Sequence, residues 1–269
     1  MNERNYRFGF STTLDYSIDI FEQLEIYATN GVTFISIGAN REHSGIFRED
    51  HFEKVREASL EHGIEIVSLH APFGGDYDLA AIDNGVRQQA IDLTLEFAEK
   101  AAEHLIPSVI IHPHHFFDDS MEACLGRSTG AIERVLAGAP PEVVIMVENL
   151  PDSRGSWLCG RLLDIFGPSR LGFCYDSSHE NMSGEPFHLL HRYYGRITTT
   201  HLSDNYGIND DHLPPGEGKI DWRQLAEFVK KSNLRDILFE VGTGERLSEP
   251  PTAIVKRTLD FAERLFNKS

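Results

Sequence analysis

The sequence predicts one parallel (β/α)8 barrel, a TIM barrel, as a single domain over residues 1–269. Eight short apolar or β-branched runs alternate with longer helical patterns, and several of the runs end in residues that bind metals. A length of 269 residues with 41% hydrophobic content suits one large α/β domain. A doubly wound open sheet is disfavoured, because the chain lacks the Gly-rich first turn typical of that class.

Each predicted strand is a short run bounded by turn residues or helical patterns. In chain order, the strands are predicted at residues 7–10, 33–37, 64–69, 109–112, 143–148, 171–175, 197–201 and 237–241.

The predicted helices are amphipathic and carry recognisable ends. In the pattern at 86–105, one face collects Ile91, Leu95, Ala98, Ala102 and Leu105. Gly63 stands where a helix C-terminal cap belongs, and Pro250 and Pro251 suit the opening of the last helix.

Four strands end in side chains that bind metals. The segments are VVIMVEN with Glu148, LGFCYDSSH with Asp176, ITTTHLSD with His201 and DILFEVG with Glu240. A carboxylate at the end of a buried strand is costly to desolvate unless a cation compensates it. Arg and Lys are not patterned at the strand ends to serve as partners. Since functional side chains of such barrels gather at the C-terminal ends of the strands, we expect a divalent metal there.

Further polar residues follow the same strands or their loops: His70, His112, His179, Asp204, Asp210 and His212. Asp204 has two open roles, a ligand or a loop-capping side chain. Phe73 and Trp222 suit either the wall of a pocket or packing.

The donor types restrict the metal. Cys124, Cys159 and Cys174 are odd in number and show no CxxC spacing, so we expect reduced thiols and a metal with oxygen and nitrogen ligands. Carboxylates and imidazoles suit Mn, Zn, Co or Fe, with one, two or three ions.

Charge and hydropathy narrow the partners. The net charge of −17 disfavours broad binding to nucleic acid or to an anionic membrane, although bound divalent ions would cancel several carboxylates locally. The start MNERNYRFGF lacks the regions of a secretory signal, and no run reaches the ~20 apolar residues of a membrane span, so we expect a cytoplasmic protein. The oligomeric state stays open, a homo-oligomer included.

Seven segments carry a resemblance to a known family: LHAP, IHP, VEN, CYDSSH, HLSDN, DDHLPPGEGKIDW and FEVG. In this order, they resemble the xylose isomerase-like TIM barrels, which join sugar and sugar-phosphate isomerases and epimerases with the type IV apurinic endonucleases. The resemblance implies that Glu148, Asp176, His201 and Glu240 are the metal ligands of the isomerase and epimerase branch. It also matches additional ligand positions of the trinuclear zinc endonucleases to His70, His112, His179, Asp210 and His212.

We favour the isomerase or epimerase branch, with a small polyhydroxylated carbonyl substrate. A metal at the carbonyl stabilises the enediolate that forms when the neighbouring proton leaves, and the resemblance implies Glu148 and Glu240 as the acid–base pair. A zinc-dependent endonuclease of abasic DNA is the alternative. The chain reads HAPFGGD and ENLPDSRG where that branch usually has Ser-Tyr-Leu and Thr-Ala-Gly-Gln-Gly types of segment. A sugar or cyclitol dehydratase, which uses the same metal, also stays open.

Overall fold

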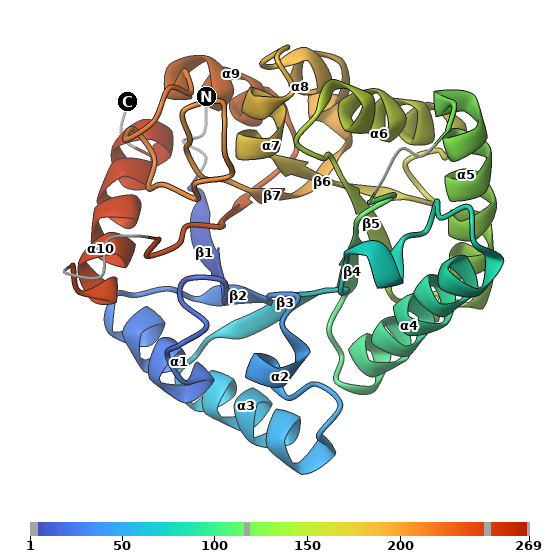
Figure 1. Ribbon diagram of the computed structural model, residues 1–269. Coiled ribbons are helices and arrows are strands. Elements are labelled where there is room, and N and C mark those ends of the chain that lie inside the picture. The colour runs from blue at the N-terminus through green and yellow to red at the C-terminus, as the bar shows by residue number, and fades with distance from the viewer. Residues whose placement is uncertain (1–4, 116–118, 245–248, 268–269) are drawn as a thin grey trace.

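Eight parallel strands form a barrel in a computed structural model that describes residues 5–115, 119–244 and 249–267 (Figure 1). The strands are β1 (Arg7–Ser11), β2 (Phe34–Ile37), β3 (Glu65–His70), β4 (Ser108–Ile111), β5 (Val144–Glu148), β6 (Gly172–Asp176), β7 (Ile197–His201) and β8 (Asp236–Phe239). They are hydrogen-bonded in the order β7-β6-β5-β4-β3-β2-β1-β8. The predicted TIM barrel is therefore confirmed.

Strands β7 and β8 meet just beyond the end of β7. Leu202 forms an isolated parallel bridge with Phe239, and its N–H donates to the carbonyl of Leu238 at 3.0 Å. The N–H of Glu240 donates in turn to the carbonyl of Leu202, also at 3.0 Å. Glu240 thus stands where the two end strands of the sheet come together.

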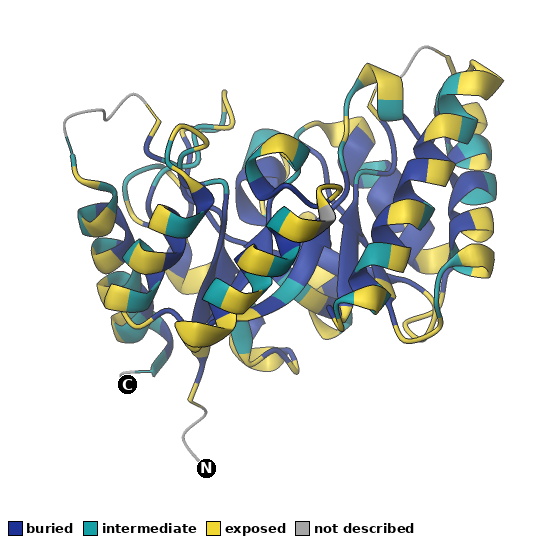
Figure 2. Cartoon of the chain, turned by 90° about the horizontal axis from the view of Figure 1, so that it is seen from below, coloured by how far each residue is buried: buried dark blue, intermediate teal, exposed yellow. Residues whose placement is uncertain are grey.

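Helices surround the ring of strands (Figure 1). They are α1 (Ile20–Thr29), α2 (Arg41–Ser44), α3 (Glu49–Glu61), α4 (Asn84–Glu103), α5 (Met121–Gly138), α6 (Ser153–Ile165), α7 (Ser177–Met182), α8 (His188–Tyr193), α9 (Trp222–Lys231) and α10 (Pro251–Ala262). Figure 2 shows buried strands inside and exposed residues on the outer faces of the helices. Apolar packing between strands and helices therefore makes the main core.

A smaller apolar layer lies beneath the mouth of the barrel. Ile110, Met146 and Cys174 form a buried cluster separate from the main core. Each stands two residues before a predicted site residue, and side chains two apart on a strand point to the same side. The alternation that buries this cluster in the interior therefore also turns Glu148 and Asp176 inward.

The predicted elements agree with the structure except near their ends. All eight strands are present, but His112 and Glu240, predicted as strand residues, directly follow β4 and β8. Leu105 was expected on the buried face of the helix at 86–105, and this prediction is wrong. Helix α4 ends at Glu103, and Leu105 is 88% exposed with a φ of 59°, which breaks the helical periodicity.

The two predicted helix ends are confirmed. Gly63 follows α3 with a φ of +70°, the left-handed conformation that ends a helix and favours glycine. Pro250 is the N-cap of α10, and Pro251 is its first residue.

The three cysteines are buried and free, as expected for reduced thiols. Among the described residues, no helix combines the length and apolar character needed to cross a bilayer.

Candidate metal centre

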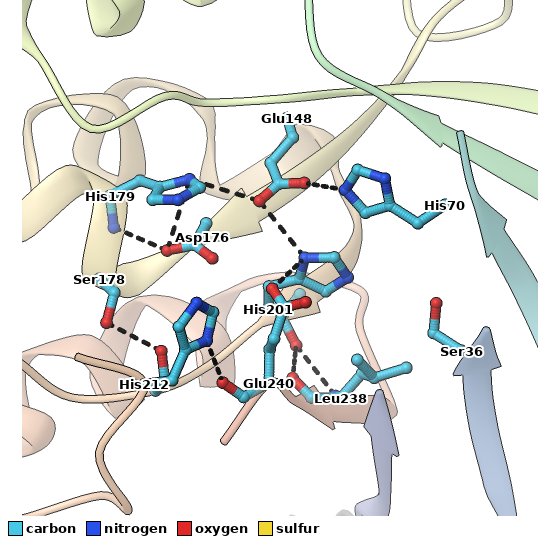
Figure 3. Close-up of polar contacts among 12 residues, drawn as sticks. Ser36, His70, Glu148, Asp176, Ser178, His179, His201, His212, Leu238 and Glu240 are labelled. Carbon is cyan, nitrogen blue, oxygen red and sulfur yellow. Dashed lines mark hydrogen bonds and ion pairs between the residues drawn. The ribbon is translucent and has the colours of Figure 1, made fainter. Parts of the chain in front are cut away.

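Four predicted ligands meet at the carboxyl-terminal mouth of the barrel (Figure 3). Glu148, Asp176 and His201 end β5, β6 and β7, and Glu240 directly follows β8. One donor atom from each lies within 4.8 Å of the others, and all four residues are buried. The barrel thus gathers three carboxylates and one imidazole from strands far apart in the sequence.

One imidazole nitrogen lies between the two glutamates. Nδ1 of His201 is 2.8 Å from Oε2 of Glu240 and 3.3 Å from Oε1 of Glu148. Since β5 and β8 lie on either side of β7 in the ring, the two carboxylates approach the imidazole from different strands. Two carboxylates therefore face one small volume.

Asp176 has one satisfied and one unsatisfied oxygen. Oδ1 accepts the N–H of His179 at 2.7 Å and so caps helix α7, whereas Oδ2 is buried without a hydrogen-bond partner. Nε2 of His201 is buried without a partner as well. An unsatisfied buried carboxylate oxygen is costly, and a divalent cation would compensate it. The donor set and this oxygen fit an oxygen- and nitrogen-ligated metal.

Asn149 holds Asp176 in place. Its side-chain amide donates to the carbonyl of Asp176 at 2.8 Å, and its Oδ1 accepts the N–H of Asp176 at the same distance. The sequence placed Asn149 beside Glu148 at the end of a predicted strand, in the VEN segment, but did not predict its contacts with Asp176.

A second group of donors shares Glu148. Its Oε2 is 3.1 Å from Nε2 of His70 and 3.5 Å from Nε2 of His112, and donor atoms of the three residues lie within 4.8 Å of one another. Nδ1 of His70 lies 2.8 Å from the carbonyl of Ala71, which orients the ring with Nε2 toward the site. The two oxygens of Glu148 therefore face two different donor groups.

A third group surrounds Asp210. Its Oδ2 is 3.2 Å from Nε2 of His179 and 3.0 Å from Nε2 of His212. Nδ1 of His179 lies 2.8 Å from the carbonyl of Asn149, and Nδ1 of His212 lies 2.7 Å from the carbonyl of Glu240. All nine predicted site residues thus join one polar network at the mouth.

The histidines keep the glutamates ionised. Burial favours the neutral carboxyl, but His201, His112 and His70 outweigh it and hold the pKa of Glu148 well below its usual value. Burial is likewise outweighed at Glu240, whose pKa His201 and His212 lower to about 2. Both glutamates are therefore anionic at neutral pH.

Other members of the network titrate nearer to neutrality or above it. Burial raises the pKa of Asp176 to about 7. At His212, burial opposes the charge, but the Asp210 carboxylate raises the pKa to about 10. Without a metal, protons on the three imidazoles whose pKa is raised, those of His179, His201 and His212, balance the carboxylates, and a bound cation would displace these protons.

Cys174 was not predicted near the site. Its sulfur belongs to a compact group with Glu148 and His201. Burial raises its pKa to about 12, which keeps the thiol neutral in the absence of a metal.

Two adjoining cavities open at this mouth. The inner cavity, of about 310 Å³, is lined by His70, His112, His179 and Glu240 among others. The outer cavity, of about 610 Å³, is lined by residues that follow β1, β2, β3, β7 and β8. Phe73, Asp210 and His212 line both. The ring of Phe73 stacks on His112 with centroids 4.1 Å apart, so Phe73 is a wall residue.

Asp204 belongs to the loop rather than to the donor groups. It is fully buried, and its Oδ1 accepts the N–H groups of Asn205 at 2.9 Å and Ile220 at 3.1 Å. A side chain at Gly218 would collide with this carboxylate. Of the two roles that the sequence left open, the structure supports loop capping.

Relatives of known sequence are similar over most of the chain. Uncharacterized protein y4fM of Sinorhizobium fredii is 23% identical over an alignment of 259 residues, and the match covers 82% of this chain and 80% of that protein. A protein named probable endonuclease 4 from Mycobacterium bovis is 28% identical over 187 residues, covering 64% of this chain and 72% of that one.

Solved structures share the fold. The structure of the IolI protein with a bound zinc atom has a TM-score of 0.82 at 16% identity. The superposition covers 97% of this chain and 98% of the IolI chain. D-psicose 3-epimerase of Clostridium cellulolyticum H10 with D-tagatose has a TM-score of 0.78 at 12% identity, with coverage of 97% and 99%.

A family-level match accounts for both kinds of similarity. Residues 24–265, nearly the whole described barrel, match the family described as xylose isomerase-like TIM barrel. The seven motif segments lie at the strand ends and loops around the mouth, where the sequence resemblance predicted them. The chain belongs to the xylose isomerase-like TIM barrel family.

Proposed function

We propose that this protein is a divalent-metal-dependent isomerase or epimerase that moves a proton next to a carbonyl of a small polyhydroxylated substrate. One observation carries the proposal: two buried, anionic glutamates, Glu148 and Glu240, flank His201, and Glu240 lines a cavity of about 310 Å³. Pockets of about this size and larger accept small molecules.

The ion would be held by Glu148, Asp176, His201 and Glu240. When bound, the ion would act as a Lewis acid that polarises the carbonyl and stabilises the enediolate of the substrate. The unsatisfied Oδ2 of Asp176 supports this assignment, because no donor among the described residues serves that oxygen.

The two glutamates would exchange the proton at the carbon beside the carbonyl. One would remove it through a carboxylate oxygen, and the other, after taking up a proton from solvent, would return that proton to the opposite face. His212 fixes the backbone of Glu240 through the 2.7 Å contact of its Nδ1 with the Glu240 carbonyl. His179 presents Nε2 toward Asp210 in the inner cavity, within reach of a substrate hydroxyl.

Charge supports a small substrate over a nucleic acid. The chain has a net charge of −17, and neither cavity contains Lys or Arg among its described lining residues. A DNA backbone would find no Lys or Arg there, and His212, which lines both cavities, is already paired with Asp210.

A zinc-dependent phosphodiester hydrolase of the endonuclease type is the second candidate. The observation that favours it is the sharing of Glu148 between two donor groups, with His179, Asp210 and His212 forming a third. Several ions held close together suit in-line displacement at phosphorus. The similarity to probable endonuclease 4 points the same way.

Three measurements on one preparation separate these functions: the metal content, the products formed in D2O and the nicking of a duplex that carries an abasic site. Protein purified without added metal is analysed for metal content and then incubated in D2O with D-fructose and D-tagatose. The proposal expects deuterium at the carbon next to the carbonyl without loss of mass. A product lighter by one water would indicate a dehydratase instead. Nicking of a duplex that carries an abasic site, with about three zinc ions per chain, would establish the hydrolase.

Variants test the two-carboxylate mechanism. Glu148→Gln and Glu240→Gln should each lower turnover by about 100-fold or more while the far-UV circular dichroism stays native. Glu227→Gln, on the exposed face of α9, is the matched control and should leave turnover unchanged. Near-normal turnover in either site variant would remove the mechanism.

A further inference from the structure

The outer cavity is a natural continuation of the candidate site. It has about twice the volume of the inner cavity, about 610 Å³ against about 310 Å³. The two share Phe73, Asp210 and His212 as lining residues, so a substrate group that extends from the metal centre past these residues enters the outer cavity. A single sugar ring at the inner cavity would leave this space to water.

Two aromatic side chains offer surface to an occupant of the outer cavity. Tyr16 is 41% exposed and Phe73 is 48% exposed, and both line the cavity. Each ring is supported by an imidazole: Tyr16 packs edge-on against His43 with centroids 5.2 Å apart, and Phe73 stacks on His112. Aromatic surfaces fixed in this way suit packing against the C–H face of a sugar ring.

Fixed oxygen acceptors accompany the aromatic rings. The carboxylate of Asp15 accepts the N–H of Ser17 at 2.9 Å and the hydroxyl of Thr243 at 2.9 Å, which anchors it between the loops after β1 and β8. Asp211 lines the same cavity from the loop after β7. Carboxylates in such positions accept hydrogen bonds from sugar hydroxyls.

The same walls are poorly suited to a phosphate. None of the described lining residues of the outer cavity is Lys or Arg. Arg41, the first residue of α2, donates to the hydroxyl of Tyr77 at 3.0 Å, with its guanidinium carbon 5.5 Å from the centre of that ring. At the start of α2, the side chain of Asn40 already accepts two backbone N–H groups. His212, in the same lining, already pairs with Asp210 at 3.0 Å. The usual phosphate partners, a cation or a free helix N-terminus, are thus occupied or missing in the described lining.

We propose that the outer cavity is a subsite for an uncharged sugar ring joined to the reacting ketose. The preferred substrate class is then a glycosylated keto sugar and not a sugar phosphate. This inference rests on the proposed isomerase or epimerase function, which the inner cavity carries.

Three probes that differ only at one position of the ketose test the inference. D-fructose, D-fructose 6-phosphate and isomaltulose, which carries a glucosyl group on the same oxygen, are titrated into the metal-loaded protein by calorimetry. Isomaltulose should bind about tenfold more tightly than D-fructose, and D-fructose 6-phosphate should bind no more tightly than D-fructose. Inorganic phosphate is titrated separately, so that anion binding at the metal is subtracted.

Three variants at two residues of the outer cavity, and one control, complete the test. Tyr16→Ala should bring the affinity for isomaltulose down to that for D-fructose, whereas Tyr16→Phe, which keeps the ring, should retain the preference. Asp211→Asn should raise the affinity for D-fructose 6-phosphate several-fold, because it removes one negative charge from the wall. Glu227→Gln should change none of these values.

The outcomes separate the subsite from the reaction. Tighter binding of D-fructose 6-phosphate than of isomaltulose, an unchanged preference in Tyr16→Ala, or no binding of any probe would each overturn the subsite. Deuterium exchange into D-fructose without a preference for isomaltulose would keep the proposed function and reject the subsite. A preference for isomaltulose without exchange would keep the subsite and reject the isomerase.

Discussion

The carboxylate of Asp204 accepts a hydrogen bond from the indole Nε1 of Trp222 at 2.8 Å, and both residues are buried. The oxygen that accepts the indole N–H, Oδ2, also accepts the N–H of Gly216 at 2.9 Å. The backbones of Asp204 and Leu213 also exchange two hydrogen bonds, of 2.7 and 2.8 Å. The loop after β7 is therefore folded around Asp204. This folding positions His212, the residue before Leu213, at the site.

Asp204→Asn should loosen this loop without destroying the barrel. An asparagine directs an N–H₂ group at donors that now face an anion, and each hydrogen bond to a charged group is worth roughly 1.5–3 kcal/mol. We expect the free energy of unfolding to fall by about 2–4 kcal/mol in urea titration. The metal content should also fall, because Asp210 and His212 lose their support.

Trp222→Phe is the matched control for this experiment. It removes the indole donor together with part of the ring, and it leaves the three backbone donors of Asp204 in place. Trp222→Phe should lower the free energy of unfolding by about half as much as Asp204→Asn does, and it should leave the metal content unchanged. An equal loss of metal in both variants would show that packing of the ring, and not the carboxylate, positions the loop.

Asn149→Ala should weaken the support of Asp176. The buried N–H and carbonyl of Asp176 would lose their partners, and each unsatisfied group costs about 1–3 kcal/mol. We expect lower stability in urea and weaker metal binding in calorimetry with Mn²⁺. Asn233→Ala, at an exposed position between α9 and β8, serves as the comparison and should leave metal affinity unchanged.

Removal of the metal should destabilise the protein more as the pH rises. The pKa of Asp176 is raised to about 7, so its favourable contribution to the metal-free fold is present below pH 3.8 and lost as the pH rises through 7. The pKa of His212 is raised to about 10, so its contribution is present below pH 6.5 and lost as the pH rises through 10. Both effects weaken the metal-free protein in alkaline solution.

The measurement is the melting temperature of metal-loaded and chelator-treated protein between pH 6 and 9. The difference between the two should widen with pH, and added metal should restore the loaded value. A constant difference in melting temperature across this range would contradict the idea that protons on Asp176 and His212 stabilise the metal-free protein.

His114 should make the protein sensitive to acid. Burial lowers its pKa from 6.5 to about 4, so the unfolded chain takes up a proton that the folded chain resists. Its contribution to stability is present above pH 6.5 and lost as the pH falls through 4, which amounts to about 3 kcal/mol. Urea titrations of metal-free His114→Gln should show a shallower fall between pH 6.5 and 4. A slope equal to that of the original chain would assign the acid sensitivity to other groups.

Much of the barrel could be predicted because its signals are local. The strand runs and the turn residues at Gly63 and Pro251 follow from chain periodicity and backbone conformation, and the structure confirms them. Leu105 was misplaced because a helical pattern does not reveal where the helix ends. Leu105 itself adopts the left-handed conformation, so the chain turns away directly after His104 and the apolar pattern does not continue as helix.

The sequence by itself determined the ring of strands and the residue types at its mouth, since alternation along a strand and the cost of burying a carboxylate act within a few residues. Only the tertiary structure decided which partners these residues meet. In the folded chain, Asp204 bonds within its own loop and Cys174 lies beside Glu148. Asn149 there holds Asp176 in place through hydrogen bonds to its backbone. These contacts join segments that are distant in the chain, and their distances are fixed by the closure of the barrel and the packing of its loops.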